Sequence, residues 1–444
     1  MNIKVGLVSL GCPKNLVDSE IILGILKNSG FEITNREDEA EVLVVNTCSF
    51  IEDAKKESID TILSLAGYKD RGKCRALLVA GCLAQRYPEA LIAEMPEIDG
   101  FIGTGNISDI PSAIIRILQG ERVCAVGEPG YINSAYMPRI LSTPGYTAYL
   151  KIAEGCDNLC SYCIIPKIRG RYRSRAMKDI LNEASDLAGR GVKELILVAQ
   201  DVTRYGIDIY GKPVLDDLLK HIVDIEGLVW IRLLYTYPSL INEEIIKLIA
   251  AEKKICRYLD IPVQHSSNAI LSRMNRRGSS EEIKKLVDRL RSAVPGITLR
   301  TSFIVGFPGE TEDDFNELLE FMLQVRFDRV GIFVYSREEE TQAAGMADQV
   351  ADETKLKRRS RAMALQQDIS LEKNREKIGQ VQTVLVEERR SKKRMIFRGR
   401  GEGDAPGIDG KIIFKSQLDL SPGDFVRVKI TGAREYDLHG ELIT

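Results

Sequence analysis

Two long stretches of this chain alternate apolar, strand-like runs with amphipathic, helix-like runs, and this alternation constrains the fold more than any other feature. In the first stretch, residues 4–119, the strand-like runs are VGLVSLG, EVLVVNT and ALLVAG. In the second, residues 146–336, they are YTAYLKI, ELILVA, VWIRLLY, RYLDIPV, ITLRTSFIV and VGIFVY. Strands that alternate with helices form parallel sheets covered by those helices. The pattern therefore predicts an α/β protein in which an open parallel sheet precedes an incomplete (β/α)6 barrel.

The remaining segments complete a division of the chain into five parts. Several Pro and Gly residues at 121–145 indicate a linker. The stretch 351–376 has no Gly or Pro and is rich in Lys, Arg, Leu and Ala, which predicts a connecting helix. Short runs from residue 377 onward, separated by Gly, Pro and Asp, predict a small antiparallel β-barrel. The expected parts are an N-terminal domain at 1–120, the linker at 121–145, a barrel at 146–350, the helix at 351–376 and a C-terminal β-barrel at 377–444.

Composition excludes several classes of protein. The chain has 444 residues, 44 % of them hydrophobic and 28 % charged, as in an ordinary multidomain globular protein. No apolar run approaches the roughly 18 residues that a membrane helix needs, and the start MNIKVGLVSLG has the pattern of a strand, unlike a signal peptide. We therefore expect a cytoplasmic protein, with neither a membrane nor DNA as a partner. Nine cysteines are too few for a disulfide scaffold in a chain of this length, which favours ligands or catalysts.

Three of these cysteines stand together in the segment GCDNLCSYC, just after the first strand of the predicted barrel. Cys156, Cys160 and Cys163 have the spacing C-x3-C-x2-C. Structural zinc normally has four protein ligands, and no further Cys or His lies nearby in sequence, so zinc is the weaker alternative. A 4Fe–4S cluster held by three thiolates would keep one iron open, and that iron could bind the amino and carboxylate groups of an amino acid. A purely structural role for the three cysteines is the remaining alternative.

Three other cysteines are far apart in sequence, but each follows one of the strand-like runs of the first domain. They are Cys12, Cys48 and Cys82. The carboxyl ends of parallel strands share one edge of the sheet, and ligands of open α/β sheets bind at that edge. Each cysteine also precedes a predicted helix, whose N-terminus favours a thiolate. Three thiolates at this edge could hold a second cluster, while the alternative is that they are small buried residues. The others, which we expect to be structural, are Cys74, Cys124 and Cys256.

The segment GCDNLCSYC resembles the signature of the radical S-adenosylmethionine (SAM) superfamily, whose incomplete barrel matches the six predicted units. The resemblance implies that the aromatic residue before the last cysteine, Tyr162, lies near the adenine of SAM, although it could be only a packing residue. It also implies that the loop SFIVGFPGET, with Gly306, Gly309 and Glu310 at a strand end, helps to hold the cofactor. Without this resemblance the loop would be only a turn.

From about residue 3 to its end, the chain resembles the methylthiotransferases, which combine a domain with three dispersed cysteines, a radical SAM barrel and a β-barrel of the TRAM kind. The resemblance implies two 4Fe–4S clusters. The cluster on the barrel would generate the radical that removes hydrogen from the substrate, and the cluster on the first domain would present the sulfur. SAM would be both the radical source and the methyl donor. The implied partners are a low-potential electron donor such as a flavodoxin or ferredoxin, and a sulfur donor.

Three segments resemble the branch of this family that modifies the β-carbon of an aspartate in protein twelve of the small ribosomal subunit. They are GCPKNLVDSE, where the tRNA-modifying branch usually has Gln-Met in place of Pro13 and Lys14, QDVTRYG, and RGRGEGDAPGIDG. The first alternative is methylthiolation of an isopentenyl-type adenosine in tRNA. The second is an iron–sulfur electron carrier or scaffold. Basic clusters at 167–175 and 389–400 would suit either substrate.

Overall fold

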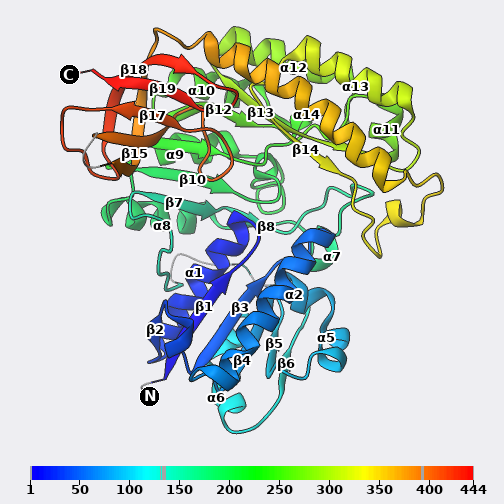
Figure 1. The fold of residues 1–444 in the computed structure, drawn as a ribbon, viewed down its shortest axis with the longest axis vertical. Helices are drawn as coiled ribbons and strands as arrows, with labels where there is room; N and C mark the ends of the chain where they lie inside the picture. The colour runs from blue at the N-terminus through cyan, green and yellow to red at the C-terminus, as the bar shows by residue number, and fades with distance from the viewer. Residues whose placement is uncertain (1–2, 131, 133–136, 392–394, 444) are drawn as a thin grey trace.

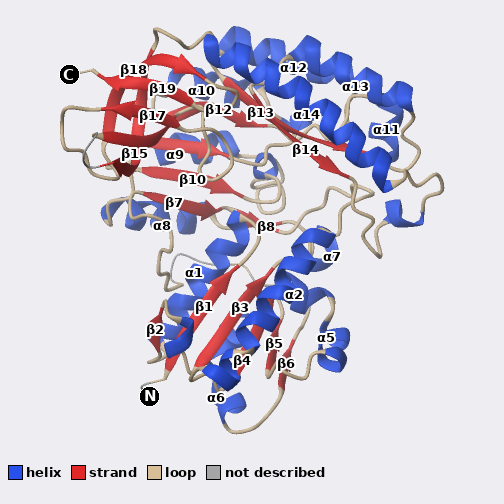
Figure 2. Ribbon diagram, viewed as in Figure 1, coloured by secondary structure: helices blue, strands red, loops and turns tan. Residues whose placement is uncertain are grey.

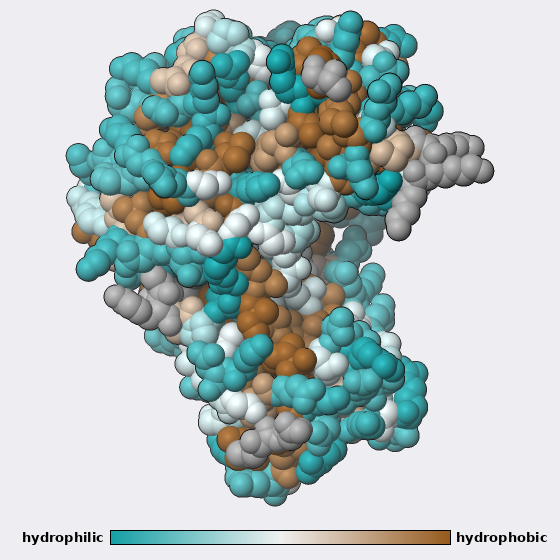
Figure 3. Space-filling view, turned by 90° about the vertical axis from the view of Figure 1, so that its left-hand side faces the viewer, coloured by the Kyte–Doolittle hydropathy of each residue, from teal (hydrophilic) through white to brown (hydrophobic). Residues whose placement is uncertain are grey.

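The structure is a computed structural model that describes residues 3–130, 132, 137–391 and 395–443. Figure 1 shows the N-terminal sheet domain below, the central barrel above it, and the small C-terminal barrel packed beside the central one. Figure 3 shows a narrower lower part beneath a broad upper part, with apolar residues along the junction between them. Among the described residues, no helix combines the length and the hydrophobicity needed to cross a bilayer.

The described N-terminal residues form a parallel sheet with the strand order β2-β1-β3-β4-β5-β6. Its central strands β3 and β4 are buried along their whole length, because helices cover both faces of the sheet. The strands are β1 (Lys4–Ser9), β2 (Glu32–Thr34), β3 (Val42–Thr47), β4 (Ala76–Gly81), β5 (Gly100–Ile102) and β6 (Val123–Ala125). The helices are α1 (Pro13–Asn28), α2 (Glu52–Ala66), α3 (Tyr68–Arg71), α4 (Cys82–Arg86), α5 (Pro88–Glu94) and α6 (Ile110–Leu118).

The open parallel sheet was correctly predicted, but it has more strands than the three apolar runs indicated. The additional strands β2, β5 and β6 have three residues each, which is too short for a clear sequence pattern. Strand β6 lies inside the segment 121–145 that was expected to be a linker, so the sheet extends further along the chain than predicted. Residues 131 and 133–136 of that segment lie outside the described residues, and the domain boundaries stay predictions.

The central domain is the predicted six-unit barrel. In the described part of the chain its strands are all parallel and have the order β14-β13-β12-β11-β10-β7, so β14 and β7 are the open edges. The strands are β7 (Thr147–Lys151), β10 (Glu194–Val198), β11 (Trp230–Leu233), β12 (Ile255–Asp260), β13 (Thr298–Val305) and β14 (Arg329–Val334). The surrounding helices are α8 (Met177–Gly189), α9 (Leu215–Val223), α10 (Glu243–Ala251), α11 (Asn268–Arg273), α12 (Ser280–Ala293) and α13 (Glu312–Val325).

The two faces of this sheet have different neighbours. Alternate residues of a strand face opposite sides, and Leu195 and Leu197 of β10 pack in the large apolar core of the central domain. Figure 2 shows the helices of this domain outside its strands. The intervening Ile196 belongs to a second core, which also contains Val17 of α1 and Ala405 of the C-terminal domain. The inner face of the barrel is therefore covered from both neighbouring domains.

Helix α14 (Asp352–Arg375) occupies the segment in which a connecting helix was predicted. It packs along the barrel, where the Arg358 guanidinium donates to the backbone oxygen of Glu310 (3.0 Å) and the Gln366 amide donates to that of Phe327 (3.1 Å). The helix therefore forms part of the barrel's outer layer as well as a connection.

The C-terminal domain is a closed five-stranded barrel in the described residues, with the order β15-β16-β17-β19-β18. Its neighbouring strands are antiparallel, as predicted, except that β17 and β19 pair in parallel. The strands are β15 (Val381–Ser391), β16 (Ile396–Gly401), β17 (Ile412–Lys415), β18 (Phe425–Ala433) and β19 (Leu438–Leu442). Its loop after β16 enters the central barrel, where Arg232 donates to the backbone oxygen of Glu402 (2.6 Å) and Tyr258 donates to Asp409 (2.8 Å).

Candidate functional site

The three dispersed cysteines lie at the carboxyl edge of the N-terminal sheet, as the sequence predicted. Figure 1 shows β1 and β3 pointing toward the central barrel, so this edge faces the junction between the two domains. Cys12 follows β1 and caps α1, Cys48 follows β3, and Cys82 is the first residue of α4. Gly11 has a φ of +88°, and a Cβ there would lie 2.7 Å from the Cβ of Cys48. Glycine is therefore needed for the close approach of these two loops.

The thiols of this first set influence one another electrostatically. Burial, together with the neighbouring Cys82 and Cys12, raises the pKa of Cys48 to about 12. Burial also raises the pKa of Cys82, and Cys12 acts in the same direction. For Cys12, burial alone would raise the pKa, but Lys14 and Arg169 lower it. The three sulfurs thus share one buried site in which cations stabilise the thiolate form.

A buried network of charges connects this set to the central barrel. Arg169, at the end of α7 (Ile165–Arg169), donates to the Cys82 sulfur at 3.4 Å. The same guanidinium forms an ion pair with Asp18 of α1. Asp18 also pairs with Lys151 at the end of β7, and Lys151 pairs with Glu154 at 2.6 Å. All four charged side chains are at most 5 % exposed, so the two domains meet through a desolvated polar junction.

The second set, Cys156, Cys160 and Cys163, lies in one loop at the carboxyl end of the barrel strands. The loop begins after β8 (Ala153–Glu154), which pairs with β9 (Arg173–Ser174). Burial raises the pKa of Cys156 to about 11, while burial and the neighbouring Cys160 raise that of Cys163. Two donors point at these sulfurs: the backbone N–H of Asn158 toward Cys156 (3.4 Å) and Arg276 toward Cys160 (3.7 Å).

The donors in both sets fit iron–sulfur clusters. Hydrogen bonds to cluster-ligating sulfurs are among the features that set the reduction potential of such clusters. Within the described residues, no three His, Cys, Asp or Glu side chains converge closely enough to hold a single metal ion. In a 4Fe–4S cluster each thiolate binds a different iron, so the ligands surround the cluster and do not meet at one point. The thiols and the donors beside them are therefore of the kind that ligate iron–sulfur clusters.

Tyr162 and the Gly306 loop lie together, beside the second set. Tyr162 packs against a small apolar cluster that contains Phe307, and Arg276 donates to its hydroxyl at 3.4 Å. The structure thus unites Tyr162 and this loop, which are distant in sequence and were both predicted to bind SAM. Their contact with the cofactor stays a prediction.

Glu310 points inward, into the loop that contains it. Its carboxylate accepts hydrogen bonds from the backbone N–H groups of Gly306 and Phe307 and pairs with Arg358 at 3.1 Å. Gly306 and Gly309 have φ values of +74° and +81°, and a Cβ on Gly306 would lie 2.2 Å from Cγ of Lys355. Glu310 and the glycines therefore shape the loop. The backbone of the loop is the part that is available to bind a ligand.

The two cysteine sets lie on the same junction, because helix α7 follows the second set and reaches the first. Ile164, directly after Cys163, and Ile168 of α7 form a buried cluster with Cys82. We name this region, defined by the six cysteines, Lys14 and the Asp18, Lys151, Glu154 and Arg169 network, the cysteine junction.

Lys14 and the basic cluster that contains Arg169 were noted in the sequence, but their position beside the cysteines was not predicted, and Arg276 was not identified. Arg169 and Arg276 each donate to a cysteine sulfur, and Lys14 lies two residues beyond Cys12. The sequence signal for Arg169 is its position six residues after Cys163, at the end of a short helix. Nothing in the sequence near Arg276 indicates its contact with Cys160, which is 116 residues away.

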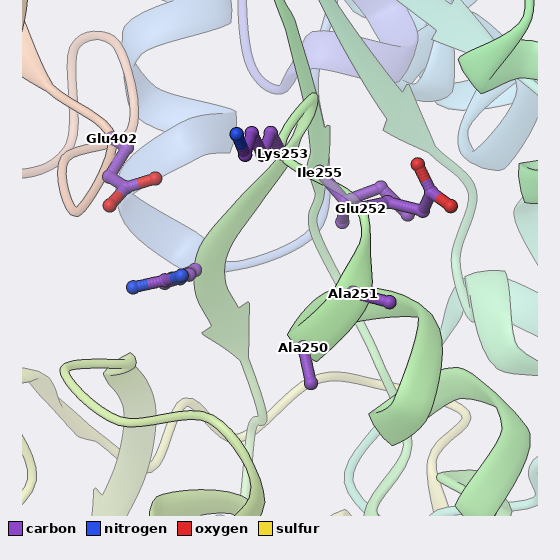
Figure 4. A pocket seen from close by; sticks show the side chains of 7 residues that line it. Ala250, Ala251, Glu252, Lys253, Ile255 and Glu402 are labelled. Carbon is purple, nitrogen blue, oxygen red and sulfur yellow. The ribbon is translucent and has the colours of Figure 1, made fainter.

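The pocket drawn in Figure 4 lies elsewhere. It has a volume of about 380 Å³ and is lined by residues that include Ala250, Glu252 and Ile255, together with Glu402 from the C-terminal domain. Ile255 begins β12, so the pocket is at the amino end of the barrel strands, whereas the second cysteine set is at their carboxyl end.

Comparisons with known proteins agree with this architecture. Family models match the uncharacterized protein family UPF0004 at residues 4–103, the radical SAM superfamily at 150–322 and the TRAM domain at 378–443. A solved structure of the radical SAM methyltransferase TsrM from Kitasatospora setae covers 86 % of this chain and 81 % of its own, with a TM-score of 0.56 and 18 % identity. The fold and the cysteine loop thus define a radical SAM protein, a class that uses a 4Fe–4S cluster and SAM.

Full-length relatives define the family more narrowly. The ribosomal protein uS12 methylthiotransferase RimO of Pelotomaculum thermopropionicum is 65 % identical, with 100 % of both chains covered. Those of Desulforamulus reducens and Clostridioides difficile are 53 % and 48 % identical, with 99 % of each chain covered. This chain belongs to the family of ribosomal protein uS12 methylthiotransferases.

Proposed function

We propose that this protein is a radical SAM enzyme that attaches a methylthio group to the β-carbon of an aspartate in ribosomal protein uS12. The observation that carries the proposal is the 65 % identity, over the full length, to a uS12 methylthiotransferase. The reaction replaces one hydrogen on that carbon by sulfur bearing a methyl group. Because the carbon has no leaving group, ionic substitution has no easy path, and a radical step is chemically reasonable. The proposed substrate is part of the ribosome, so we expect the enzyme to act in the cytoplasm.

The six cysteines of the cysteine junction would hold two 4Fe–4S clusters. Cys156, Cys160 and Cys163 would ligate the cluster that binds SAM and supplies the electron for its cleavage, and the first set would ligate the cluster that presents sulfur. The arginines that donate to Cys160 and Cys82 place positive charge directly beside these sulfurs. The site lies between the domains, and exclusion of water there would protect a radical from side reactions.

The contacts of Tyr162 and the Gly306 loop support a role in holding SAM beside the second set. Tyr162 presents an aromatic ring next to Phe307, and the loop backbone turns sharply at Gly306 and Gly309. Two partners complete the proposal: a low-potential electron donor such as a flavodoxin or ferredoxin, and a donor of sulfur.

The test is a reaction in vitro. The reconstituted protein is incubated anaerobically with reductant, SAM, a sulfide source and a uS12 peptide that contains the target aspartate. We expect 5′-deoxyadenosine and a peptide heavier by one methylthio group in place of hydrogen. An iron–sulfur carrier or scaffold would form no 5′-deoxyadenosine. Methylthiolation of an isopentenyl-type adenosine in tRNA, with no change in the peptide, would assign the chain to the tRNA branch.

A further inference from the structure

Lys14 is a buried lysine without a carboxylate partner in the described parts of the chain. It is 9 % exposed, and its Nζ lies 3.4 Å from the centroid of the Tyr235 ring. Lys151, the other buried lysine of the cysteine junction, pairs with both Asp18 and Glu154. Cys12 and Glu154 act on this ammonium electrostatically, but among the described residues no carboxylate lies within ion-pair distance of it, so it has lost its hydration without direct contact with a carboxylate. The position of Lys14 is therefore suited to an anionic ligand.

The Tyr235 ring holds this ammonium in place without neutralising it. Tyr235 follows β11 at the carboxyl end of the barrel, and its φ of 63° is unusual for a residue other than glycine. Its backbone N–H donates to Asp260 at 3.1 Å, and Asp260 pairs with Arg300 at 2.7 Å. A cation over an aromatic face recovers part of the hydration energy that it lost on burial. The ring also fixes the direction of the lysine side chain. The ammonium is thus positioned before any ligand arrives.

The location of Lys14 connects it to the chemistry proposed for the junction. Lys14 is the second residue of α1, a helix of 16 residues that Cys12 caps. The ammonium extends from the edge of the N-terminal sheet to the end of a barrel strand, so it lies between the first cysteine set and the barrel. The N-terminal end of α1 carries partial positive charge, which adds to the attraction for an anion.

We propose that Lys14 binds the carboxylate of the aspartate that is modified and thereby selects an aspartyl side chain as the substrate. This inference rests on the proposed function. The β-carbon of aspartate is bonded directly to the carboxylate carbon, so an ion pair with Lys14 holds the reacting carbon beside the first cysteine set. An adenosine base has no carboxylate and leaves the ammonium unpaired. A site that pairs a buried polar group with its substrate discriminates strongly against a molecule without the matching group.

The experiment measures binding to the cluster-containing enzyme by fluorescence anisotropy, anaerobically and without reductant. The probes are two labelled uS12 peptides, one with the target aspartate and one with asparagine in its place. We expect the unmodified enzyme to prefer the aspartate peptide by about 10–100-fold, as for a charge-assisted hydrogen bond in a buried site. In Lys14→Met the preference should fall to about 1-fold, so that the two peptides bind equally. The change should come from weaker binding of the aspartate peptide alone. Lys14→Arg should keep most of the preference for the aspartate peptide.

Lys27→Met is the matched control, because Lys27 lies on the same helix and is exposed. It should keep the full preference. If Lys14→Met keeps the preference for the aspartate peptide, or lowers the affinity for both peptides equally, the inference is overturned. If Lys14→Met does not fold with its iron, Lys14→Gln provides the same comparison. Methylthiolation of the aspartate peptide by the unmodified enzyme tests the proposed function separately: product with an unchanged preference in Lys14→Met overturns the role of Lys14 alone, and no product overturns both.

Discussion

The central barrel meets its two neighbours through buried ionic interfaces that differ in their balance of charge. At the C-terminal interface each arginine has a carboxylate: Arg400 and Arg232 pair with Glu194, and Arg329 pairs with Asp404 at 3.0 Å. At the cysteine junction, Asp18 and Glu154 are shared by Lys151 and Arg169, while Lys14 pairs with neither.

The difference in charge balance separates a structural interface from a functional one. At the C-terminal interface Arg232, Arg400 and Arg329 have carboxylate partners within the chain, so these pairs fasten the small barrel to the large one. The cysteine junction has surplus positive charge beside thiols, and anionic ligands would balance that charge. Iron–sulfur clusters held by thiolates and a carboxylate substrate are ligands of that kind.

The largest effect should follow from Cys160→Ala. We expect complete loss of SAM cleavage and of roughly half the iron, because the cluster that binds SAM needs all three thiolates. The measurements are 5′-deoxyadenosine by liquid chromatography and iron per protein. Cys124→Ala is the control, since Cys124 is exposed and lies on the edge strand β6. Cleavage of SAM at a normal rate in Cys160→Ala would show that the second set does not ligate the cluster that binds SAM.

Replacing the first set tests whether the two halves of the cysteine junction have separate tasks. The triple Ala variant of Cys12, Cys48 and Cys82 should lose about half its iron and form no methylthiolated peptide. It should still convert SAM to 5′-deoxyadenosine, because the second set is intact. Unchanged iron content in this variant would mean that the three cysteines are structural.

Arg169→Gln should weaken the cysteine junction itself. Removal of one partner from a buried ionic network costs about 3–5 kcal/mol, because the remaining charges stay desolvated. We expect a lower free energy of unfolding, measured as a lower Tm. Arg171→Gln is the matched control, because the exposed Arg171 pairs with Asp157 at the surface, and it should leave Tm unchanged. Equal Tm values for the two variants would show that the buried network around Arg169 does not stabilise the fold.

The C-terminal interface should show a pH dependence that the charge pairs explain. Burial alone would raise the pKa of Glu194, but Arg400 and Arg232 lower it to about 2, whereas an unfolded glutamate has a pKa near about 4.3. Its contribution of about 2–3 kcal/mol is therefore complete above the unfolded pKa and is lost as the pH falls toward about 2. The Tm difference between the unmodified protein and Glu194→Gln should shrink over that range. A constant difference would show that Glu194 does not titrate in this way.

The sequence predicted the parts of the fold whose signals are local. All six barrel strands were found, because each is an apolar run of four to eight residues bounded by polar ones. The short strands β2, β5 and β6 were missed, since three residues become a strand only by pairing with a neighbour that is already in place. The parallel pairing of β17 with β19 is likewise a property of barrel closure.

The same limit applies to the candidate site. The second cysteine set is local, so its spacing alone indicated a cluster, and the first set was found because strand ends share an edge. The pairing of Arg169 with Asp18 crosses 151 residues and joins two domains, so no sequence window contains it. A motif also does not say which way a side chain points: the Glu310 carboxylate accepts from the backbone of its own loop, and its contact with the cofactor stays a prediction.

The most direct test of the account is the mass of ribosomal protein uS12 from cells that lack this enzyme. We predict that it is lighter by one methylthio group in place of hydrogen than uS12 from the parent strain, with a normal tRNA nucleoside profile. A plasmid with the unmodified gene should restore the mass, and the triple Ala variant of the first cysteine set should not. An unchanged uS12 mass, together with loss of a methylthioadenosine from tRNA, would contradict the account.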